Sequence, residues 1–269
     1  MINTKFYTDK NFKINYHMQG NGPVIILLHG YMDDMSIWDN ITKFFNNNYK
    51  LIVIDLPGHG RSQYLKDNIN IEDISDSIIN LLIFENINQF NLIGYSYGGY
   101  IAIDLLGRYE EFLNSLILIH SHPYPDTTKK IKSREREMSY IKDGKFELIK
   151  SLQVKKRFHE SYVHKNPEQL IKLEKTINSM DPVNTIITLN LILNRPDRSY
   201  NLSTSHIPIL FCLSEHDEQA DYNRINKDFR TQENIDIELF KNSKHMCFWE
   251  EKDLFLLKVS QFISMHLST

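Results

Sequence analysis

Short apolar runs alternate with amphipathic segments through the first 120 residues of the chain. Four runs contain few polar residues and are bounded by turn residues: Val24–Leu28, Leu51–Ile54, Phe90–Ile93 and Leu116–Ile119. Runs of this kind are typical of strands covered on both faces, which occur in parallel sheets. Between them, Ser36 and Asn70 are placed to cap helices whose apolar residues recur at helical spacing. The alternation predicts βαβ units and a doubly wound, mostly parallel α/β sheet.

The two ends of the chain extend this pattern. Phe6–Thr8 and Phe12–Met18 alternate in polarity on either side of a short turn, which predicts an N-terminal antiparallel hairpin. Toward the other end, strand-like runs return at Pro208–Leu213 and Ile235–Phe240, and a helical pattern follows at Leu254–Met265.

The segment between these parts has a different character. Residues 121–204 contain no convincing strand but show charged helical segments over roughly 129–142, 145–156, 168–179 and 183–193. Asn166 and Pro167 suit the cap and the first position of the third of these helices. The pattern predicts an α/β core of residues 1–120 and 205–269, interrupted by a helical cap of residues 121–204. We expect this cap on the side where loops leave the carboxyl ends of the strands.

Composition excludes several classes of partner. The net charge of −3 over 269 residues gives no indication of nucleic-acid binding or of attachment to an anionic membrane. The N-terminal residues lack an apolar signal region, and the apolar runs are too short to span a bilayer. The two cysteines, Cys212 and Cys247, lie among apolar neighbours, so we expect buried thiols in a reducing compartment. These features predict a soluble cytoplasmic protein, without indicating an oligomeric state.

The most informative motif is Gly94-Tyr95-Ser96-Tyr97-Gly98, which lies between a predicted strand and a predicted helix. A serine between two glycines at such a junction is the pattern of a nucleophile elbow. The glycines allow the strand and the helix to approach closely, and the turn presents the serine hydroxyl above the helix N-terminus. A glycine-rich loop with a surface serine would give the same five letters, but the strand-to-helix context favours Ser96 as a nucleophile.

A second loop is placed to bind an oxyanion. His29-Gly30-Tyr31 follows the first central strand, and the backbone N–H of Tyr31 can point toward Ser96. Together with the N–H of Tyr97 it would form a two-donor oxyanion hole. We interpret His29 as a structural residue that holds the turn by hydrogen bonds.

Two further loops supply a carboxylate and an imidazole. Asp217 follows the strand that ends near Leu213, and we favour it as the acid over Glu215 and Asp221. His245 follows the last strand and is predicted to reach both Asp217 and Ser96. In this scheme His245 takes the Ser96 proton, Asp217 holds the imidazole, and an acyl-enzyme forms and is hydrolysed.

At this point the chain resembles the α/β-hydrolase family. The motifs that carry the resemblance are His29-Gly30-Tyr31, Asp55 to Ser62, Gly94 to Gly99, Glu215-His216-Asp217 and His245. It covers about residues 5–120 and 205–268, and residues 121–204 resemble the family's variable helical cap. The resemblance implies an α/β-hydrolase fold and a structural role for the loop from Asp55 to Ser62. Ser214 departs from the glycine of many relatives, which affects the local turn.

Other candidates have simpler interpretations. His120-Ser121-His122 lacks a convincing third ligand at metal-site spacing, so we interpret it as a hinge of the cap and predict neither a metal nor a cofactor. His122, Tyr124 and Trp249 are candidates for the substrate pocket. Basic residues alternate with Glu135, Glu137 and Glu160, which indicates a solvated helix face rather than an anion-steering surface; these are Lys129, Lys130, Lys132, Arg134, Arg136, Lys155, Lys156 and Arg157.

The sequence leaves three functions open. The first is a serine hydrolase of a small ester or related acyl substrate. The second is a non-hydrolytic or C–C-bond-cleaving member of the same fold, similar to a haloperoxidase or to the menaquinone-pathway lyase, although Tyr100 stands where that lyase usually has arginine. The third is a ligand-binding receptor that keeps the fold without turnover. Epoxide hydrolysis and dehalogenation are disfavoured because their nucleophile is Asp rather than Ser96.

Overall fold

A single nine-stranded sheet runs through residues 4–266, the part of the chain that the computed structural model describes. The hydrogen-bonded order is β1 (Thr4–Thr8), β2 (Phe12–Gln19), β4 (Lys50–Ile54), β3 (Val24–Leu28), β6 (Phe90–Tyr95), β7 (Leu113–Ile119), β8 (Ile209–Ser214) and β9 (Ile235–Phe240). The short β5 (Gln63–Tyr64) pairs with β2. The strands β1 and β2 form the predicted antiparallel hairpin, and every pair from β4 to β9 is parallel.

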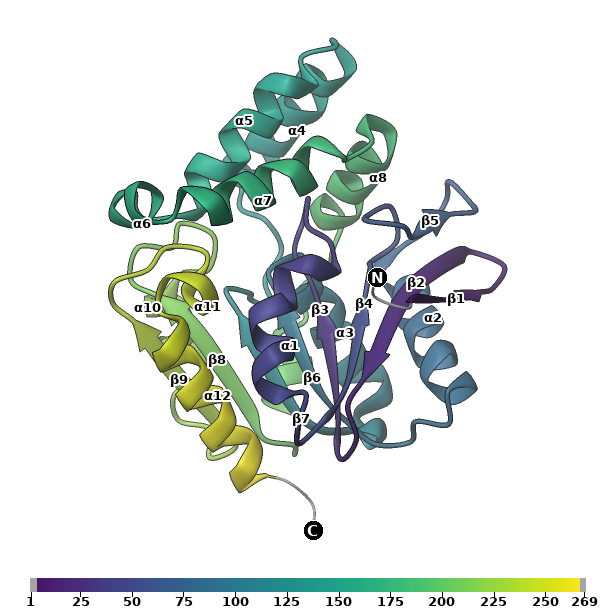
Figure 1. The fold of residues 1–269 in the computed structure, drawn as a ribbon, viewed down its shortest axis with the longest axis vertical. Coiled ribbons are helices and arrows are strands. Elements are labelled where there is room, and N and C mark those ends of the chain that lie inside the picture. Colours follow the sequence, from purple (N-terminus) through teal and green to yellow (C-terminus); the bar gives the residue numbers. More distant parts are fainter. Residues whose placement is uncertain (1–3, 267–269) are drawn as a thin grey trace.

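Helices cover both faces of this sheet (Figure 1), which explains the nearly continuous apolar strands. Successive side chains of a strand point to opposite faces. In β3, Ile26 and Leu28 pack in the same core as α2 (Ile71–Phe84) and α3 (Tyr97–Tyr109). Ile25 and Leu27 pack in the opposite core with α1 (Asp39–Phe45) and α12 (Lys252–Met265). The prediction of a doubly wound sheet is confirmed.

The chain between β7 and β8 forms helices, as the sequence indicates. They are α4 (Thr128–Lys142), α5 (Phe146–Arg157), α6 (Glu160–Lys165), α7 (Pro167–Asn178), α8 (Pro182–Leu193) and α9 (Ser199–Ser203). Figure 1 shows α4 to α8 gathered at one end of the sheet. Side chains of α4 and α5 contact residues 31 and 33, which follow β3, so these helices lie over the carboxyl ends of the strands.

Some local predictions need correction. Ser36 does not cap a helix; the Asp34 carboxylate accepts a hydrogen bond from the Ser36 amide and begins a 3-10 turn, η1 (Met35–Trp38). An acidic side chain two residues earlier therefore performs the capping. In contrast, Asn70 forms the predicted cap of α2, in a reciprocal capping box with Asp73.

Several elements escaped prediction because they are too short to show a clear apolar periodicity. They are β5, α6, α9, α10 (Tyr222–Phe229) and α11 (Cys247–Glu250). Both cysteines are buried and unpaired, as expected. Within residues 4–266 the helices are too short or too polar for any of them to traverse a lipid bilayer.

Candidate active site

Ser96 lies on a sharp turn between β6 and α3. Its φ of 50° and ψ of −111° place a non-glycine residue in a strained conformation, which typically costs about 1–3 kcal/mol. The flanking glycines are sterically required, because a Cβ on Gly98 would lie 2.4 Å from the Leu28 carbonyl oxygen. On Gly94 a Cβ would lie 2.8 Å from the Gly98 carbonyl oxygen. The predicted elbow geometry is present, with the serine partly exposed at its tip.

The three side chains expected to converge lie in one hydrogen-bonded row. The distance from Ser96 Oγ to His245 Nε2 is 3.0 Å, and the distance from His245 Nδ1 to Asp217 Oδ1 is also 3.0 Å. With Asp217 as acceptor, His245 carries its proton on Nδ1 and leaves Nε2 free to accept from the serine hydroxyl. This tautomer suits removal of the Ser96 proton.

The side chain of Asp217 is buried, and protein donors supply its hydrogen bonds. Its carboxylate accepts hydrogen bonds from the amides of Gln219 at 2.9 Å and Ala220 at 3.2 Å, in addition to His245. Burial on its own would raise the pKa of this carboxyl group, but the neighbouring His245 and His120 hold it well below its ordinary value. Asp217 therefore remains ionised at neutral pH.

The alternative acids occupy different environments. Glu215 is exposed, and Asp221 caps α10 by accepting hydrogen bonds from the amides of Asn223 and Arg224. Of the three acids weighed from the sequence, only Asp217 contacts His245 in the described residues.

His120 is a part of this site that sequence reasoning missed. It directly follows β7 and has a left-handed φ of 47°, and its Nδ1 lies 3.2 Å from Asp217 Oδ2. The Cys247 amide donates to His120 Nε2 at 3.3 Å, which leaves the ring proton on Nδ1, facing the carboxylate. Burial lowers the pKa of His120, so the ring is neutral. The only sequence signal was its position at the end of the strand beside β8.

His120, Asp217 and His245 also form a group with the composition of a metal site. Their ligand atoms lie within 4.8 Å of one another. Both imidazole Nδ1 atoms, however, lie close to the two oxygens of one carboxylate, at 3.0 and 3.2 Å. The hydrogen bond from His245 and the close approach of His120 to the same carboxylate account for the arrangement, and we assign no metal to it.

His29 holds the loop after β3, as predicted. Its Nδ1 donates to the Gly30 carbonyl at 2.8 Å, and its Nε2 accepts from the Leu56 amide at 2.9 Å. In a trans peptide the N–H points away from the C=O. Anchoring the Gly30 carbonyl thus orients the Tyr31 N–H. Neither that amide nor the Tyr97 amide donates to an acceptor in the main-chain or capping hydrogen bonds of residues 4–266, so both donors remain available.

Asp55 fastens the loop that follows β4. Its carboxylate accepts from the Asn15 side chain at 2.7 Å and from the amides of Met35 at 2.8 Å and Arg61 at 2.9 Å. Gly60 has a φ of 53° and faces this carboxylate so closely that a Cβ would overlap it. These contacts support the structural role expected for the Asp55–Ser62 loop.

The three predicted pocket residues occupy two different places. His122 stacks on Tyr124 with ring centroids 5.7 Å apart, and also lies 5.4 Å from the Tyr100 ring. Trp249 instead packs on Phe158 in the other hydrophobic core and donates its indole N–H to the Ile37 carbonyl. The described contacts do not bring these three side chains together or join any of them to Ser96.

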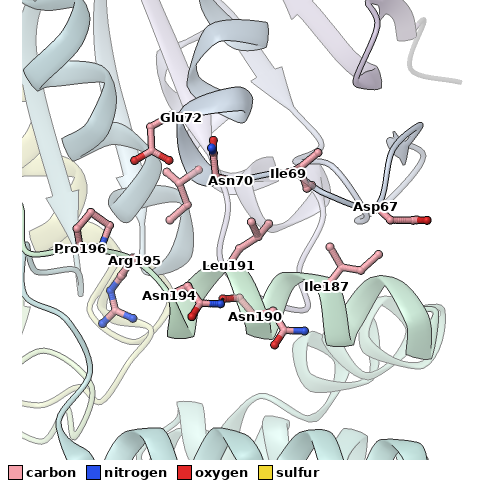
Figure 2. Close-up of a pocket in the computed structure, with 11 residues that line it drawn as sticks. Asp67, Ile69, Asn70, Glu72, Ile187, Asn190, Leu191, Asn194, Arg195 and Pro196 are labelled. Atoms are coloured by element: carbon pink, nitrogen blue, oxygen red, sulfur yellow. The ribbon is translucent and has the colours of Figure 1, made fainter.

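A pocket of about 150 Å³ lies away from the serine, between α8 and the start of α2. Figure 2 shows residues of α8, including Ile187 and Leu191, facing Ile69 and Asn70 across it. Arg195 at its edge is already bonded to the Asp126 carboxylate and the Ile192 carbonyl. The pocket contains none of the three residues of the row.

The basic residues of α4 and α5 are not uniformly solvated. Arg134 pairs with Asp126, and Arg157 is 5% exposed and pairs with Asp33 at 2.5 Å. The expectation of a solvated face is therefore wrong for these two positions. Charge alternation along the sequence did not reveal that they face the core rather than solvent.

Comparison with known proteins supports the fold. A family model described as alpha/beta hydrolase fold matches residues 23–251. A pimeloyl-(acyl-carrier protein) methyl ester esterase of Nitrosomonas europaea is 29% identical over 41% of this chain and 42% of its own length. An (E)-2-((N-methylformamido)methylene)succinate hydrolase of Acinetobacter baylyi is 24% identical over 64% of this chain and 65% of its own length.

Solved structures extend the similarity to nearly the whole chain. An esterase from Thermogutta terrifontis superposes with a TM-score of 0.90 and 20% identity, covering 99% of this chain and 100% of that one. The curated relatives are matched over only 34–65% of their length. Because the family model spans most of the sequence, the chain belongs to the α/β-hydrolase family.

Proposed function

We propose that the protein is a serine hydrolase of a small ester or related acyl substrate, with Ser96, His245 and Asp217 as its catalytic triad. The observation that carries the proposal is the continuous row of two 3.0 Å contacts from hydroxyl to imidazole to carboxylate. These groups come from three loops far apart in the sequence, at the carboxyl ends of β6, β8 and β9. Such convergence is the geometric criterion for a nucleophile, its base and an orienting acid.

The chemistry begins at Ser96. His245 Nε2 accepts the hydroxyl proton as Ser96 Oγ attacks the substrate carbonyl carbon, and the carbonyl π pair moves onto oxygen. The amides of Tyr31 and Tyr97 donate hydrogen bonds to that oxyanion. Collapse of the intermediate expels the alkoxide, which takes the proton from His245 and leaves an acyl-enzyme.

Water completes the cycle in the same way. His245 removes a proton from water, the resulting hydroxide attacks the acyl carbon, and Ser96 leaves with the proton that His245 returns. Throughout, Asp217 holds the Nδ1–H of the imidazole and stabilises the imidazolium that forms at each transfer. His120 keeps this carboxylate in place from its second oxygen.

The choice of an ester substrate rests on two kinds of support. The site has a serine nucleophile with two free backbone donors, which is suited to acyl transfer. The names of several relatives also specify ester hydrolysis, including the Nitrosomonas esterase. We infer that the helices between β7 and β8 form a cap that selects the acyl or alcohol group.

The lyase alternative has less support. It would need a cation beside the elbow to bind a substrate carboxylate, and position 100 holds tyrosine. The Arg195 guanidinium does lie 4.0 Å from the centre of the Tyr100 ring, but its two terminal nitrogens donate to Asp126 and the Ile192 carbonyl, and only Nε lacks a partner among the described residues. A charge already paired in this way is poorly suited to bind a substrate carboxylate.

The first prediction concerns the nucleophile itself. Wild-type protein should hydrolyse a short activated ester such as p-nitrophenyl acetate and should be labelled by a fluorophosphonate. Peptide mapping should locate the label on Ser96, and Ser96→Ala should abolish it while lowering kcat by about 10⁴-fold or more. Ser115→Ala, a buried serine on β7 bonded to Asn91, is the matched control and should retain both activities.

The outcomes separate the candidate functions. Labelling without turnover of any ester in a chain-length series would favour a non-hydrolytic member of the family. A folded wild type that shows neither labelling nor hydrolysis would overturn the proposal. In that case a ligand-binding role becomes the better interpretation.

A further inference from the structure

Arg157, the last residue of α5, contacts both halves of the proposed machinery. Its guanidinium donates to the Asp33 carboxylate at 2.5 Å and to the Tyr31 carbonyl at 2.6 Å. Its own main-chain carbonyl accepts the backbone N–H of His245 at 2.9 Å. One residue of the helical segment therefore joins the loop that carries an oxyanion donor to the loop that carries the base.

The side chain of Arg157 is committed to this position. Arg157 and Asp33 are 6% and 1% exposed in their side chains. Burial would lower the pKa of the guanidinium, but Asp33 outweighs it and the charged form persists. A buried ion pair often contributes little net stability, because removing two charges from water offsets their attraction. We therefore assign the ion pair a role in fixing local geometry rather than in stabilising the fold.

Hydrogen bonds hold the peptide groups before and after Tyr31. The peptide that carries the Tyr31 N–H is anchored at the Gly30 carbonyl by His29. The following peptide is anchored at the Tyr31 carbonyl by Arg157. With both neighbouring carbonyls held, rotation about the two backbone bonds of Tyr31 is restricted. The next residue, Met32, has a left-handed φ of 57°, a conformation that needs such support.

The main-chain carbonyl of Arg157 holds the loop that carries His245. The last carbonyls of a helix have no intrahelical partner, so the Arg157 carbonyl at the end of α5 is free to accept from outside. It takes the N–H of His245, while the Glu250 carboxylate accepts the amide of Lys244 at 2.8 Å. The loop that presents the imidazole is held at two consecutive amides.

We propose that Arg157 is a positioning residue that keeps the Tyr31 amide aligned for oxyanion binding from the helical segment. The proposal rests on the function proposed above and adds a requirement to it. The helices between β7 and β8 then contribute to the rate of reaction as well as enclosing substrate. Arg157 touches no reacting atom; it acts through Tyr31 and Asp33.

The test uses the full chain and separates the side chain from the backbone. Arg157→Met removes the guanidinium but leaves the carbonyl that holds His245. Arg157→Lys keeps the charge but replaces the planar, two-pronged guanidinium with a single ammonium on a flexible stem, which cannot reproduce the paired geometry toward both acceptors. Arg198→Met is the matched control, since Arg198 is also buried and bonded to a carboxylate, that of Asp104, away from Ser96.

The readouts are kcat, KM, fluorophosphonate labelling rate and affinity for a boronic acid, whose tetrahedral adduct needs the oxyanion donors. Arg157→Met should lower kcat and labelling by about 10- to 10³-fold, up to the effect of losing one donor. Boronate affinity should fall by a similar factor, and KM should change by less than about threefold. The values for Arg157→Lys should lie between those of Arg157→Met and those of the wild type.

A structural role alone gives a different result. If Arg157→Met matches Arg198→Met in kcat and boronate affinity while both are folded, the positioning role is wrong and the proposed hydrolase function stands. If the wild type is inactive and unlabelled, both proposals fail. Should Arg157→Met not fold, Asp33→Leu, which removes the carboxylate that holds the guanidinium in place, must show the same selective loss of kcat or the inference is overturned.

Discussion

At the scale of single residues, the acid of the row offers the sharpest test of the proposed roles. Asp217→Asn keeps the shape of the side chain but can present an amide N–H to His245, which favours the wrong tautomer. We expect kcat to fall by about 10⁴-fold, as in a comparable triad. Steady-state hydrolysis of the activated ester measures the effect.

The neighbouring acid gives the control for this prediction. Glu215→Gln changes an exposed carboxylate two residues away and should leave kcat within about twofold of wild type. If the two variants lose the same activity, the acid has been misassigned.

The sequence allowed us to predict the site residues that directly follow strands. Ser96, Asp217 and His245 each follow a recognisable apolar run, and parallel strands bring their carboxyl ends together. His120 and Arg157 were not predicted, because their roles depend on tertiary contacts. The first requires a left-handed backbone beside β8, and the second lies on a helix whose charge pattern indicated solvent exposure.

At the scale of elements, the hydrogen bonds at the start of α2 make a measurable contribution to the stability of the fold. The Asn70 side chain accepts from the Asp73 amide at 2.8 Å, and the Asp73 carboxylate accepts from the Asn70 amide at 2.9 Å. Asn70→Ala removes one of these bonds and should destabilise the fold by about 1 kcal/mol. Urea denaturation would detect it as a lower midpoint with an unchanged slope.

A conservative replacement sharpens this prediction. Asn70→Ser retains a side-chain oxygen that can cap the helix, so its midpoint should stay close to that of wild type. Neither variant should alter fluorophosphonate labelling, since α2 does not contact the serine loop in the described hydrogen bonds. Equal loss in both variants would mean that the capping bond is not the cause.

Long elements were predicted to within a few residues, whereas short ones were not. The α7 and α8 helices begin at Pro167 and Pro182, where a fixed φ and a missing N–H make the boundary visible in sequence. By contrast, α6 has no buried residue, so it leaves no apolar periodicity to detect. The 3-10 turn at Met35–Trp38 was misassigned because its acidic cap precedes the serine that seemed suited to the role.

At the scale of the whole molecule, buried histidines make stability depend on pH. Burial lowers the pKa of His59 and of His122 to about 3, with nearby His29 and Arg195 adding to the effect, respectively. The unfolded chain binds these protons near pH 6.5, so it takes up more protons than the folded state below that pH. Stability should therefore fall as the pH drops from about 6.5 toward 3.

His122→Gln isolates one part of this effect. A neutral amide has no proton to gain on unfolding, so the variant should lose less stability than wild type between pH 7 and pH 5, by up to about 2 kcal/mol. Urea midpoints at the two pH values provide the comparison. An identical loss in the two proteins would show that His122 is not held neutral by the fold.

The two attachment points of the helical segment have a consequence for how this protein can vary. The chain leaves β7 at Ile119 and re-enters β8 at Ile209, and these strands pair directly with each other. The helices between these strands take no part in this pairing, so we expect a chimera with foreign helices at that place to keep the sheet. To keep the active-site loops in place, the foreign helices would need a side chain that, like Arg157, donates to both Asp33 and the Tyr31 carbonyl. They would also need a free carbonyl to accept the His245 amide.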